Sequence, residues 1–360
     1  MDRRGFLQAA AVTGGAVAFP RWLRADSAGG AALETQRSTL VVDGLDPSSL
    51  TVGYLDKLKA GGVDCWHTSL DDLKSFADAW SFLDANKDRI AFAGSTAEIR
   101  AAKAAGKLSV IFGWQGAEVL GDTTRSGSML RAYYQLGLRI VGIAYNIQNS
   151  FGSGNLDPTL GLSSAGRRLV EEIHDLNILL DVGGHTGERT TLDAIEVSKG
   201  RPVICSHTNI AKIADNPRCV SDKVIDAIAR TGGVIGITAI SEFIKRGRKD
   251  AQLQKTPQAT LDEFLDQIDY VKHQVGAEHV GLGPDFVDGQ PAATETGRNR
   301  LLFPREMTGD WPWTYAKGFE NISELPNVTA GLLGRGWSSA DVRRVLGENW
   351  LRVYEKAWGA

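Results

Sequence analysis

Eight short apolar runs alternate with stretches of helical periodicity, and this alternation constrains the fold more than any other feature of the sequence. The runs are rich in Val, Ile and Leu, as expected of strands buried on both faces of a sheet. Repeated strand–helix alternation predicts an α/β protein with a parallel (β/α)8 TIM barrel. A doubly wound open sheet is the alternative, but the chain contains no GxGxxG or Walker loop to support it. The expected strands are Thr39–Asp43, Val63–His67, Leu108–Gly113, Leu138–Tyr145, Ile178–Val182, Pro202–His207, Gly233–Ala239 and His279–Gly283.

Residues 38–360 are expected to form one barrel domain with two additions. Ile90–Gly94 and the helical stretch Thr96–Ala105 indicate a β-α piece inserted before the third barrel strand. A loop insertion at about 288–321 is polar and aromatic. Because it follows the last strand, we expect it to shape the substrate site. Helices are predicted at Ser163–Leu176, Thr190–Val197, Lys223–Thr231 and Leu261–Val275, with His174 on the surface of the first.

The first 31 residues are interpreted as a twin-arginine signal segment and linker. Arg3 and Arg4 precede a weakly apolar run that ends at Phe19, and Pro20 and small residues follow. The run is too short for a stable membrane span, and no later stretch reaches about 18 apolar residues. A short amphipathic helix that begins the fold is the alternative. The prediction is a periplasmic or secreted protein, exported by the twin-arginine route, without a stable membrane span.

Charge and cysteine content exclude several classes of function. The formal net charge is −3, and no Lys/Arg cluster interrupts the chain, so no nucleic-acid partner is expected. Cys65, Cys205 and Cys219 form no CxxC pair or zinc-ribbon spacing. The first two lie in apolar runs and are expected to pack in the core. A disulfide could form in an oxidising compartment, although the sequence does not require one.

Histidine and acidic residues gather at the expected strand ends, where TIM-barrel enzymes carry their reactive groups. His185 follows the fifth run and two glycines, His207 ends the sixth, and Asp285 follows the eighth. His67 ends the second run, and Arg218 lies in the loop after His207. Such residues favour a metal-assisted hydrolytic site with a carboxylate clamp. Each also has an ordinary alternative: a loop or structural histidine, a helix cap or a solvated arginine.

The chain resembles the membrane (renal) dipeptidase family from about residue 40 to the C-terminus. The resemblance implies zinc hydrolases on an amidohydrolase-like, metallo-dependent barrel, which act on peptide-like substrates and commonly form homodimers. The motifs that carry it are Leu180-Asp181-Val182-Gly183-Gly184-His185, Thr190–Ile195, Pro202–His207, Asn216–Asp222, Gly232–Val234, Gly281–Asp285, Asn327–Leu333 and Gly347–Val353.

The resemblance implies roles for four residues. His185 and His207 match the two histidines that hold one of the family's two zinc ions. Asp285 matches the acid that handles the proton of the attacking water. Arg218 matches the residue that clamps the terminal carboxylate of a dipeptide.

Four positions depart from the family pattern. Leu45 and Pro47 stand where the first strand's His-x-Asp pair belongs, and Gln115 replaces the bridging glutamate. Tyr145 replaces a histidine that polarises the scissile carbonyl. The motif around His185 also carries one extra residue. Leucine cannot ligate zinc, and a neutral amide bridges two cations poorly, so these substitutions argue against a dinuclear site.

At most one zinc ion is therefore expected. It would bind His185 and His207, and Asp285, Asp46 or His67 together with water would complete its coordination. Three protein ligands and one open position suffice for a catalytic zinc. Gln115 is a further candidate residue of this metal site.

Two functions remain open from the sequence. The first is an exported metallopeptidase that cleaves a dipeptide or small amide with a free carboxylate. Asp285 would move the proton, Arg218 would hold the carboxylate, and Tyr145 would donate to the oxyanion. The second is a family descendant that binds or matures a peptide-derived compound without hydrolysis, as the lost metal ligands suggest.

Overall fold

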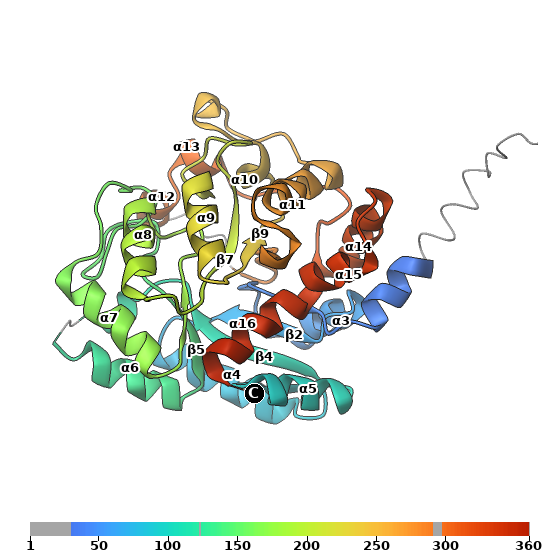
Figure 1. Cartoon of the computed structure of the whole chain (residues 1–360), viewed down its shortest axis with the longest axis horizontal. Helices are drawn as coiled ribbons and strands as arrows, with labels where there is room; N and C mark the ends of the chain where they lie inside the picture. Colours follow the sequence, from blue (N-terminus) through green and yellow to red (C-terminus); the bar gives the residue numbers. More distant parts are fainter. Residues whose placement is uncertain (1–29, 122–123, 291–296, 360) are drawn as a thin grey trace, which may run out of the picture.

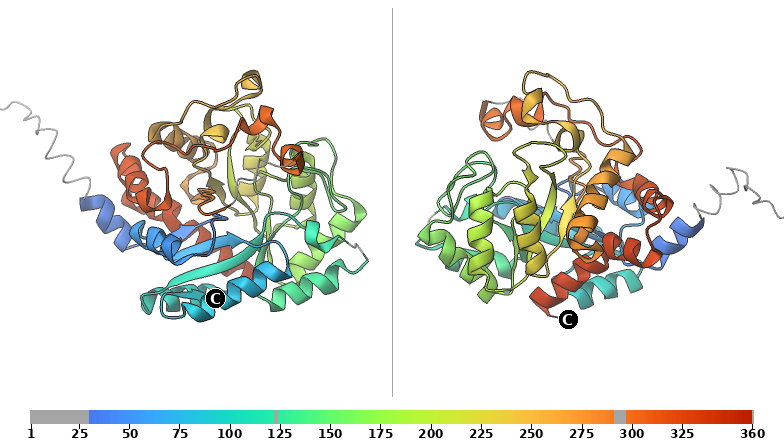
Figure 2. Two further views of the ribbon diagram at one scale, coloured as in Figure 1. Left: turned by 180° about the vertical axis from the view of Figure 1, so that it is seen from behind. Right: turned by 45° about the horizontal axis from the view of Figure 1, so that its top comes forward.

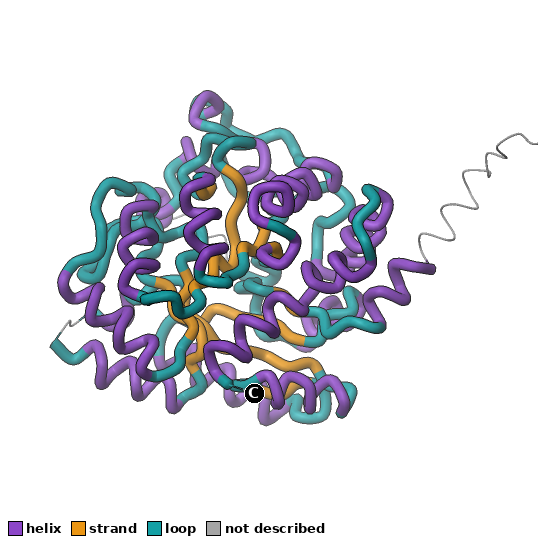
Figure 3. Tube along the Cα trace, viewed as in Figure 1, coloured by secondary structure: helices purple, strands orange, loops and turns teal. Residues whose placement is uncertain are grey.

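Eight parallel strands form a barrel surrounded by helices, which confirms the expected fold. The computed structural model describes residues 30–121, 124–290 and 297–359, so the Arg3-Arg4 signal motif lies outside the described residues. Figure 3 shows the strands inside and the helices outside. In the order β1-β2-β4-β5-β6-β7-β9-β10, the strands are Val42–Asp43, Cys65–Ser69, Leu108–Trp114, Leu138–Gly142, Leu179–Asp181, Val203–Ile210, Ile235–Ile237 and Val280–Leu282.

The first and last barrel strands meet through the segments that follow them. Gly44 N–H donates to the Leu282 carbonyl at 2.9 Å, and Asp285 N–H donates to the Leu45 carbonyl at 3.1 Å. These bonds join β10 to β1 where the two strands end. They also hold Asp285 beside the first strand, although the two are separated by most of the chain.

Two short strands lie off the barrel path. β3 (Ile90–Phe92) pairs with the outer part of β4 and leads into α5 (Thr96–Ala104), as expected for the inserted β-α piece. β8 (Cys219–Val220) pairs with the end of β7. This second pairing fixes the loop that carries Arg218 against the barrel.

Helices follow the strands as the sequence predicts. The helix α11 begins after a capping box between Thr260 and Glu263 and ends at Gly276, whose φ of 101° suits glycine. Figures 1 and 2 show the helices arranged around the strands. The longer ones are α3 (Val52–Ala60), α4 (Leu73–Ala85), α6 (Ser126–Gln135), α7 (Ser164–Asp175), α8 (Glu188–Val197), α9 (Asp222–Arg230), α11 (Leu261–Val275), α14 (Leu325–Gly334) and α16 (Asn349–Trp358).

The C-terminal helix α16 fills the end of the barrel away from the site. Its Trp350 is fully buried among residues at the starts of the strands, including Val42 and Cys65. A Cβ added at Gly44 or Gly281 would approach the indole within 2.4 to 2.6 Å, so these glycines leave room for Trp350. The barrel interior is therefore closed at one end, and ligands must enter at the other.

Three expectations about histidines were wrong. β7 spans Val203–Ile210, so His207 lies inside the strand rather than at its end. β2 spans Cys65–Ser69, so His67 lies in the middle of the strand rather than at its end. His174 is buried rather than exposed, since its helix packs against the end of α8 and its Nε2 lies 2.8 Å from the Ser198 hydroxyl. Cys65 and Cys205 are buried as expected, and all three thiols are free.

Within the described ranges, no helix combines the length and apolar character needed to span a bilayer.

Candidate active site

A cavity of about 270 Å³ opens where the barrel strands end. Its lining includes five residues proposed from the sequence, namely Gln115, Tyr145, His185, Arg218 and Asp285. The insertion after β10 contributes Gln290, Phe303, Trp311 and Trp313. Residues from distant parts of the chain therefore meet at one pocket, as a barrel mouth requires. Its remaining lining residues are Pro47, Ser69, Asp71, Phe243 and Val287.

His185 follows β6 and is held between two side-chain amide oxygens. The Asn146 side-chain amide donates to the Leu302 carbonyl at 2.8 Å and accepts from Asn155 at 3.0 Å, which fixes its oxygen toward His185. His185 Nδ1 lies 2.7 Å from that oxygen, and Nε2 lies 2.9 Å from the Gln115 side-chain oxygen. Both ring nitrogens therefore face acceptors, and the neutral ring donates to one of them while the other nitrogen keeps its lone pair. Asn146 is a positioning residue that the sequence reading did not identify.

His207, within β7, is oriented by a buried relay. The Ser206 hydroxyl donates to Asp181 at 2.5 Å, so its oxygen accepts from His207 Nδ1–H at 2.7 Å. His207 Nε2 is buried without a hydrogen-bond partner among the described residues. Burial, followed by the Arg218 charge, lowers the pKa of both His185 and His207 well below the usual value. Both rings are neutral at pH 7, the form that binds metal ions.

Arg218 and Asp285 form the charged part of the cavity. Arg218 is 1% exposed, and its three guanidinium nitrogens have no hydrogen-bond partner among the described residues. The nearest carboxylate oxygen, of Asp285, lies 3.7 Å from Nη2. Burial raises the pKa of Asp285 to about 7, against the lowering effect of Arg218. A buried guanidinium without hydrogen-bond partners is a strong indication of an anionic ligand.

Gly184 makes the position of Arg218 possible. A Cβ on Gly184 would lie 1.4 Å from Arg218 Nη1, so no larger residue fits while the arginine keeps its place. In the sequence, the Gly183-Gly184 pair is notable only as the two residues that precede His185. The contact shows a steric requirement, which sequence alone does not reveal because Arg218 is distant in the chain.

Tyr145 covers one face of His185. The two ring centroids are 3.8 Å apart at an interplanar angle of 20°. Glu118 accepts hydrogen bonds from Tyr145 N–H at 2.8 Å and from the Asn149 amide at 2.9 Å. Burial raises the pKa of Tyr145, which keeps its hydroxyl protonated and available as a donor. Glu118 therefore positions Tyr145.

The acidic residues after β1 lie outside the cavity lining. Asp46 accepts from Ser48 N–H at 2.9 Å and from the Tyr54 hydroxyl, which occupies both carboxylate oxygens. Burial raises the pKa of Asp46 to about 7. Burial and the neighbouring Asp46 also raise the pKa of Asp43 well above its usual value. This pair is thus a proton-holding cluster inside the fold.

His67 also lies outside the cavity lining. Its Nδ1–H donates to the Gly44 carbonyl at 2.6 Å, and Nε2 has no partner among the described residues. Burial lowers the pKa of His67 to about 4. The ring packs so closely on Gly113 that a Cβ there would lie 2.1 Å from Nε2.

The residues present do not fit a dinuclear metal centre. Across the described part of the chain, no three His, Cys, Asp or Glu side chains gather closely enough to hold a metal ion. Leu45 is fully buried and Pro47 lines the cavity. Because both side chains are apolar, neither supplies a metal ligand. What the chain offers to a single ion is the lone pairs of His185 and His207, whose ring centroids are 4.9 Å apart.

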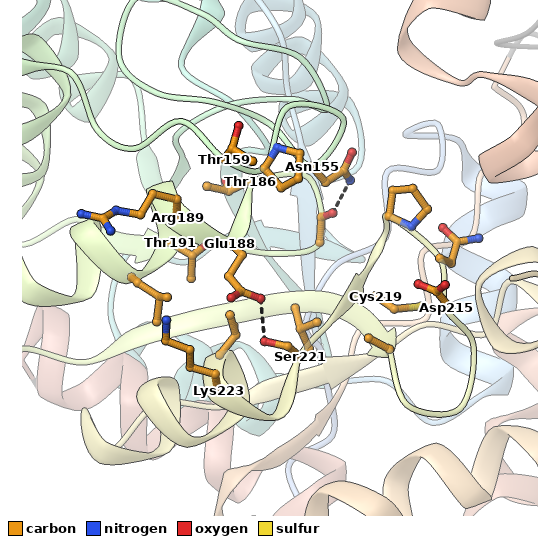
Figure 4. Close-up of a pocket in the computed structure, with 18 of the residues that line it drawn as sticks. Asn155, Thr159, Thr186, Glu188, Arg189, Thr191, Asp215, Cys219, Ser221 and Lys223 are labelled. Carbon is orange, nitrogen blue, oxygen red and sulfur yellow. Dashed lines mark hydrogen bonds between the residues drawn. The ribbon is translucent and has the colours of Figure 1, made fainter. Parts of the chain in front are cut away.

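A second cavity, of about 380 Å³, contains none of the expected site residues. It lies beside α8 and the loop that carries Arg218 (Figure 4). Its polar groups largely satisfy one another: the Ser221 hydroxyl donates to Glu188 at 2.7 Å, and Arg248 pairs with Asp215 at 3.1 Å. The smaller cavity, with its unpartnered guanidinium, is the better candidate site.

Several known proteins are similar to this chain in sequence or in fold. Dipeptidase tcpJ of Claviceps purpurea is 29% identical over 291 residues, 80% of this chain and 60% of that protein. An uncharacterized dipeptidase of Schizosaccharomyces pombe is 30% identical over 258 residues, 70% of this chain and 53% of that protein. The chain thus spans only part of the length of these relatives.

The solved structure of an amidohydrolase from Pseudomonas aeruginosa is 28% identical, with a TM-score of 0.80, and the match covers 91% of this chain and 99% of that one. The sequence also matches the membrane dipeptidase family, peptidase family M19, over residues 65–301 and 307–358. The family as a whole implies a metal cofactor. The chain is a member of the membrane dipeptidase family.

Proposed function

We propose that this protein binds a dipeptide or small amide with a free carboxylate at the barrel mouth and hydrolyses it. The observation that carries the proposal is Arg218, a buried guanidinium with unpartnered nitrogens in a cavity it shares with Asp285. Family membership supports a peptide-like substrate. A carboxylate offers the two parallel acceptors that a planar guanidinium binds best.

The cavity residues divide the chemical work. Arg218 holds the substrate carboxylate. Asp285, with a pKa of about 7, accepts a proton from the attacking water and returns it to the leaving amine. Tyr145, protonated and held in place by Glu118, donates to the oxygen of the scissile carbonyl as negative charge develops there.

His185 and His207 are the residues that would hold one zinc ion. Their neutral rings and the relays through Asn146 and Ser206 support this role, since such partners orient ligating imidazoles. A zinc ion acts as a Lewis acid toward a carbonyl and activates water near neutral pH. Gln115, beside His185 Nε2, supplies an amide where the family has a carboxylate.

The second candidate function is binding or maturation of a peptide-derived compound without hydrolysis. Leu45, Pro47 and Gln115 favour it, because they leave fewer ligands than a two-metal hydrolase needs. It retains the same ligand chemistry, a carboxylate on Arg218, and differs only in whether the amide bond is cleaved.

Metal analysis joined to an activity assay separates the two functions. The purified protein, loaded with Zn²⁺ and desalted, should retain zinc, with no more than one ion per chain by mass spectrometry. It should also cleave dipeptides. His207→Ala should lose both properties, and His174→Ala, at a buried histidine outside the cavity, should keep both. Protein that retains no zinc and cleaves no dipeptide would falsify the hydrolase proposal.

The N-terminal segment supports a proposal about location and the family a proposal about assembly. Arg3-Arg4 and the apolar run after them favour twin-arginine export to the periplasm or beyond. A homodimer is expected by analogy with the family. Replacing Arg3 and Arg4 by Lys should retain the full-length precursor in the cytoplasm, and light scattering should give twice the chain mass.

A further inference from the structure

One side of the site cavity is built from aromatic rings. Phe303, Trp311 and Trp313 come from the insertion after β10, and Phe243 and Tyr145 come from segments after β9 and β5. Together these five residues are termed the aromatic wall. Phe243 and Phe303 are buried, and the other three rings are partly exposed. Ligand pockets are commonly lined by aromatic side chains together with a few placed polar groups, as this cavity is.

The rings of the aromatic wall contact one another in a fixed arrangement. Phe303 and Trp313 have centroids 5.2 Å apart at 63°, and Trp311 and Trp313 have centroids 5.1 Å apart at 67°. Phe303 also meets Tyr145 edge-on, at 5.9 Å and 80°. Edge-to-face packing leaves both ring faces and ring edges available, so a further ring can join the cluster favourably.

The aromatic wall adjoins the carboxylate clamp. Arg218 Cζ lies 4.8 Å from the centre of the Phe243 ring, and Phe243 in turn lies 6.1 Å from Trp313. The buried charge of Arg218 favours an acidic group on the occupant. The cavity, about 270 Å³, is near the lower end of the roughly 300–1,000 Å³ typical of ligand pockets. The ligand is therefore small, and its acidic group and its ring lie close together.

We infer that the site selects small carboxylates that bear an aromatic ring, with the carboxylate on Arg218 and the ring on Trp313 and Phe303. This inference rests on the proposed function for the carboxylate and adds the side-chain class. Aromatic dipeptides, such as Ala-Phe, are then the preferred substrates over Ala-Leu. Trp313 also has a buried indole N–H without a hydrogen-bond partner among the described residues, which can donate to an oxygen of the ligand.

The test uses ligands that cannot be hydrolysed. NMR titration of the full chain compares 3-phenylpropanoate with 4-methylpentanoate, which share the carboxylate and differ in the ring. The aromatic acid should bind about tenfold more tightly, the upper range for a favourable ring contact. Trp313→Leu should remove this preference, and Trp313→Phe should restore part of it. Trp358→Leu, at a partly buried tryptophan on α16 outside the cavity, should keep it.

The outcomes separate this inference from the proposed hydrolysis. The aromatic preference is overturned if the two acids bind equally or if neither binds. It is also overturned if a folded Trp313→Phe protein loses affinity for both acids equally. If the preference holds while Ala-Phe is not cleaved, the hydrolase proposal fails and the inference stands. If Ala-Phe and Ala-Leu are cleaved with equal kcat/KM, hydrolysis stands and the inference fails.

Discussion

The first and second halves of the barrel place polar residues in different surroundings. After β1 and within β2, Asp46 and His67 bond to neighbouring groups of the fold and do not line the cavity. After β6 and within the loop beyond β7, His185 and Arg218 face the cavity. The first half thus contributes Gln115, Tyr145 and the exposed Asp71 to the cavity, while the second half contributes the buried Arg218 and Asp285. The buried charges of the cavity come from one half of the barrel.

The largest expected effect tests whether Asp285, in the second half of the barrel, is the group that accepts and returns the proton. Asp285→Asn should lower kcat/KM by about 1,000-fold, within the range for a lost general base. The wild-type kcat/KM should rise with pH through about 7, because burial raises the pKa of Asp285 to about 7 and only the carboxylate accepts a proton. A pH–rate profile of both proteins measures this. A wild-type profile that is flat from pH 5 to 8 contradicts the assignment.

A second effect concerns the carboxylate clamp. Arg218→Ala should weaken binding of 3-phenylpropanoate by about 100-fold, since a bidentate charged contact is lost. Gly184→Ala should weaken it similarly, because the new methyl group would occupy the place of Arg218 Nη1. Binding is measured by NMR titration. Arg248→Ala, at an exposed arginine of the second cavity, is the matched control and should bind normally. Normal binding by Gly184→Ala would show that Arg218 does not act from its observed position.

A smaller effect concerns the metal affinity of the proposed zinc site. Gln115→Glu places a carboxylate beside His185 Nε2, which now lies 2.9 Å from the amide. Zinc affinity, measured by competition with a chelator dye, should rise by about tenfold or more, as an anionic ligand replaces a neutral one. Gln290→Glu adds the same charge elsewhere on the cavity and should change affinity much less. An equal gain in both variants would indicate general electrostatics instead of ligation.

The smallest expected effect concerns Asp46, in the first half of the barrel. Its pKa is about 7 in the folded protein, well above the usual value of 3.8. Between these values the unfolded chain loses a proton that the folded protein keeps, so raising the pH favours unfolding. The wild-type Tm should fall by about 2 °C per pH unit from pH 4 to 7, and Asp46→Asn should fall less steeply. Scanning calorimetry measures this, and parallel slopes would contradict it.

Much of the fold and part of the site were predictable. Hydrophobic periodicity located the barrel strands and α11, because each pattern reports its own burial. Family motifs identified His185, Arg218 and Asp285, which the structure brings to one cavity. His67 was misjudged, since strand ends are poorly defined by periodicity and a two-residue shift moves a side chain from the mouth to the interior.

The sequence by itself determined the barrel and the family, and it predicted a reduced metal site from Leu45, Pro47 and Gln115. These conclusions depend on local pattern and residue chemistry, which need no coordinates. Only the tertiary structure decided that Gly184 makes room for Arg218 and that Asn146 and Gln115 contact the two ring nitrogens of His185. Only the tertiary structure placed Trp313 in the same cavity as Arg218. Such contacts join segments far apart in the chain, and their geometry exists only once the barrel has formed.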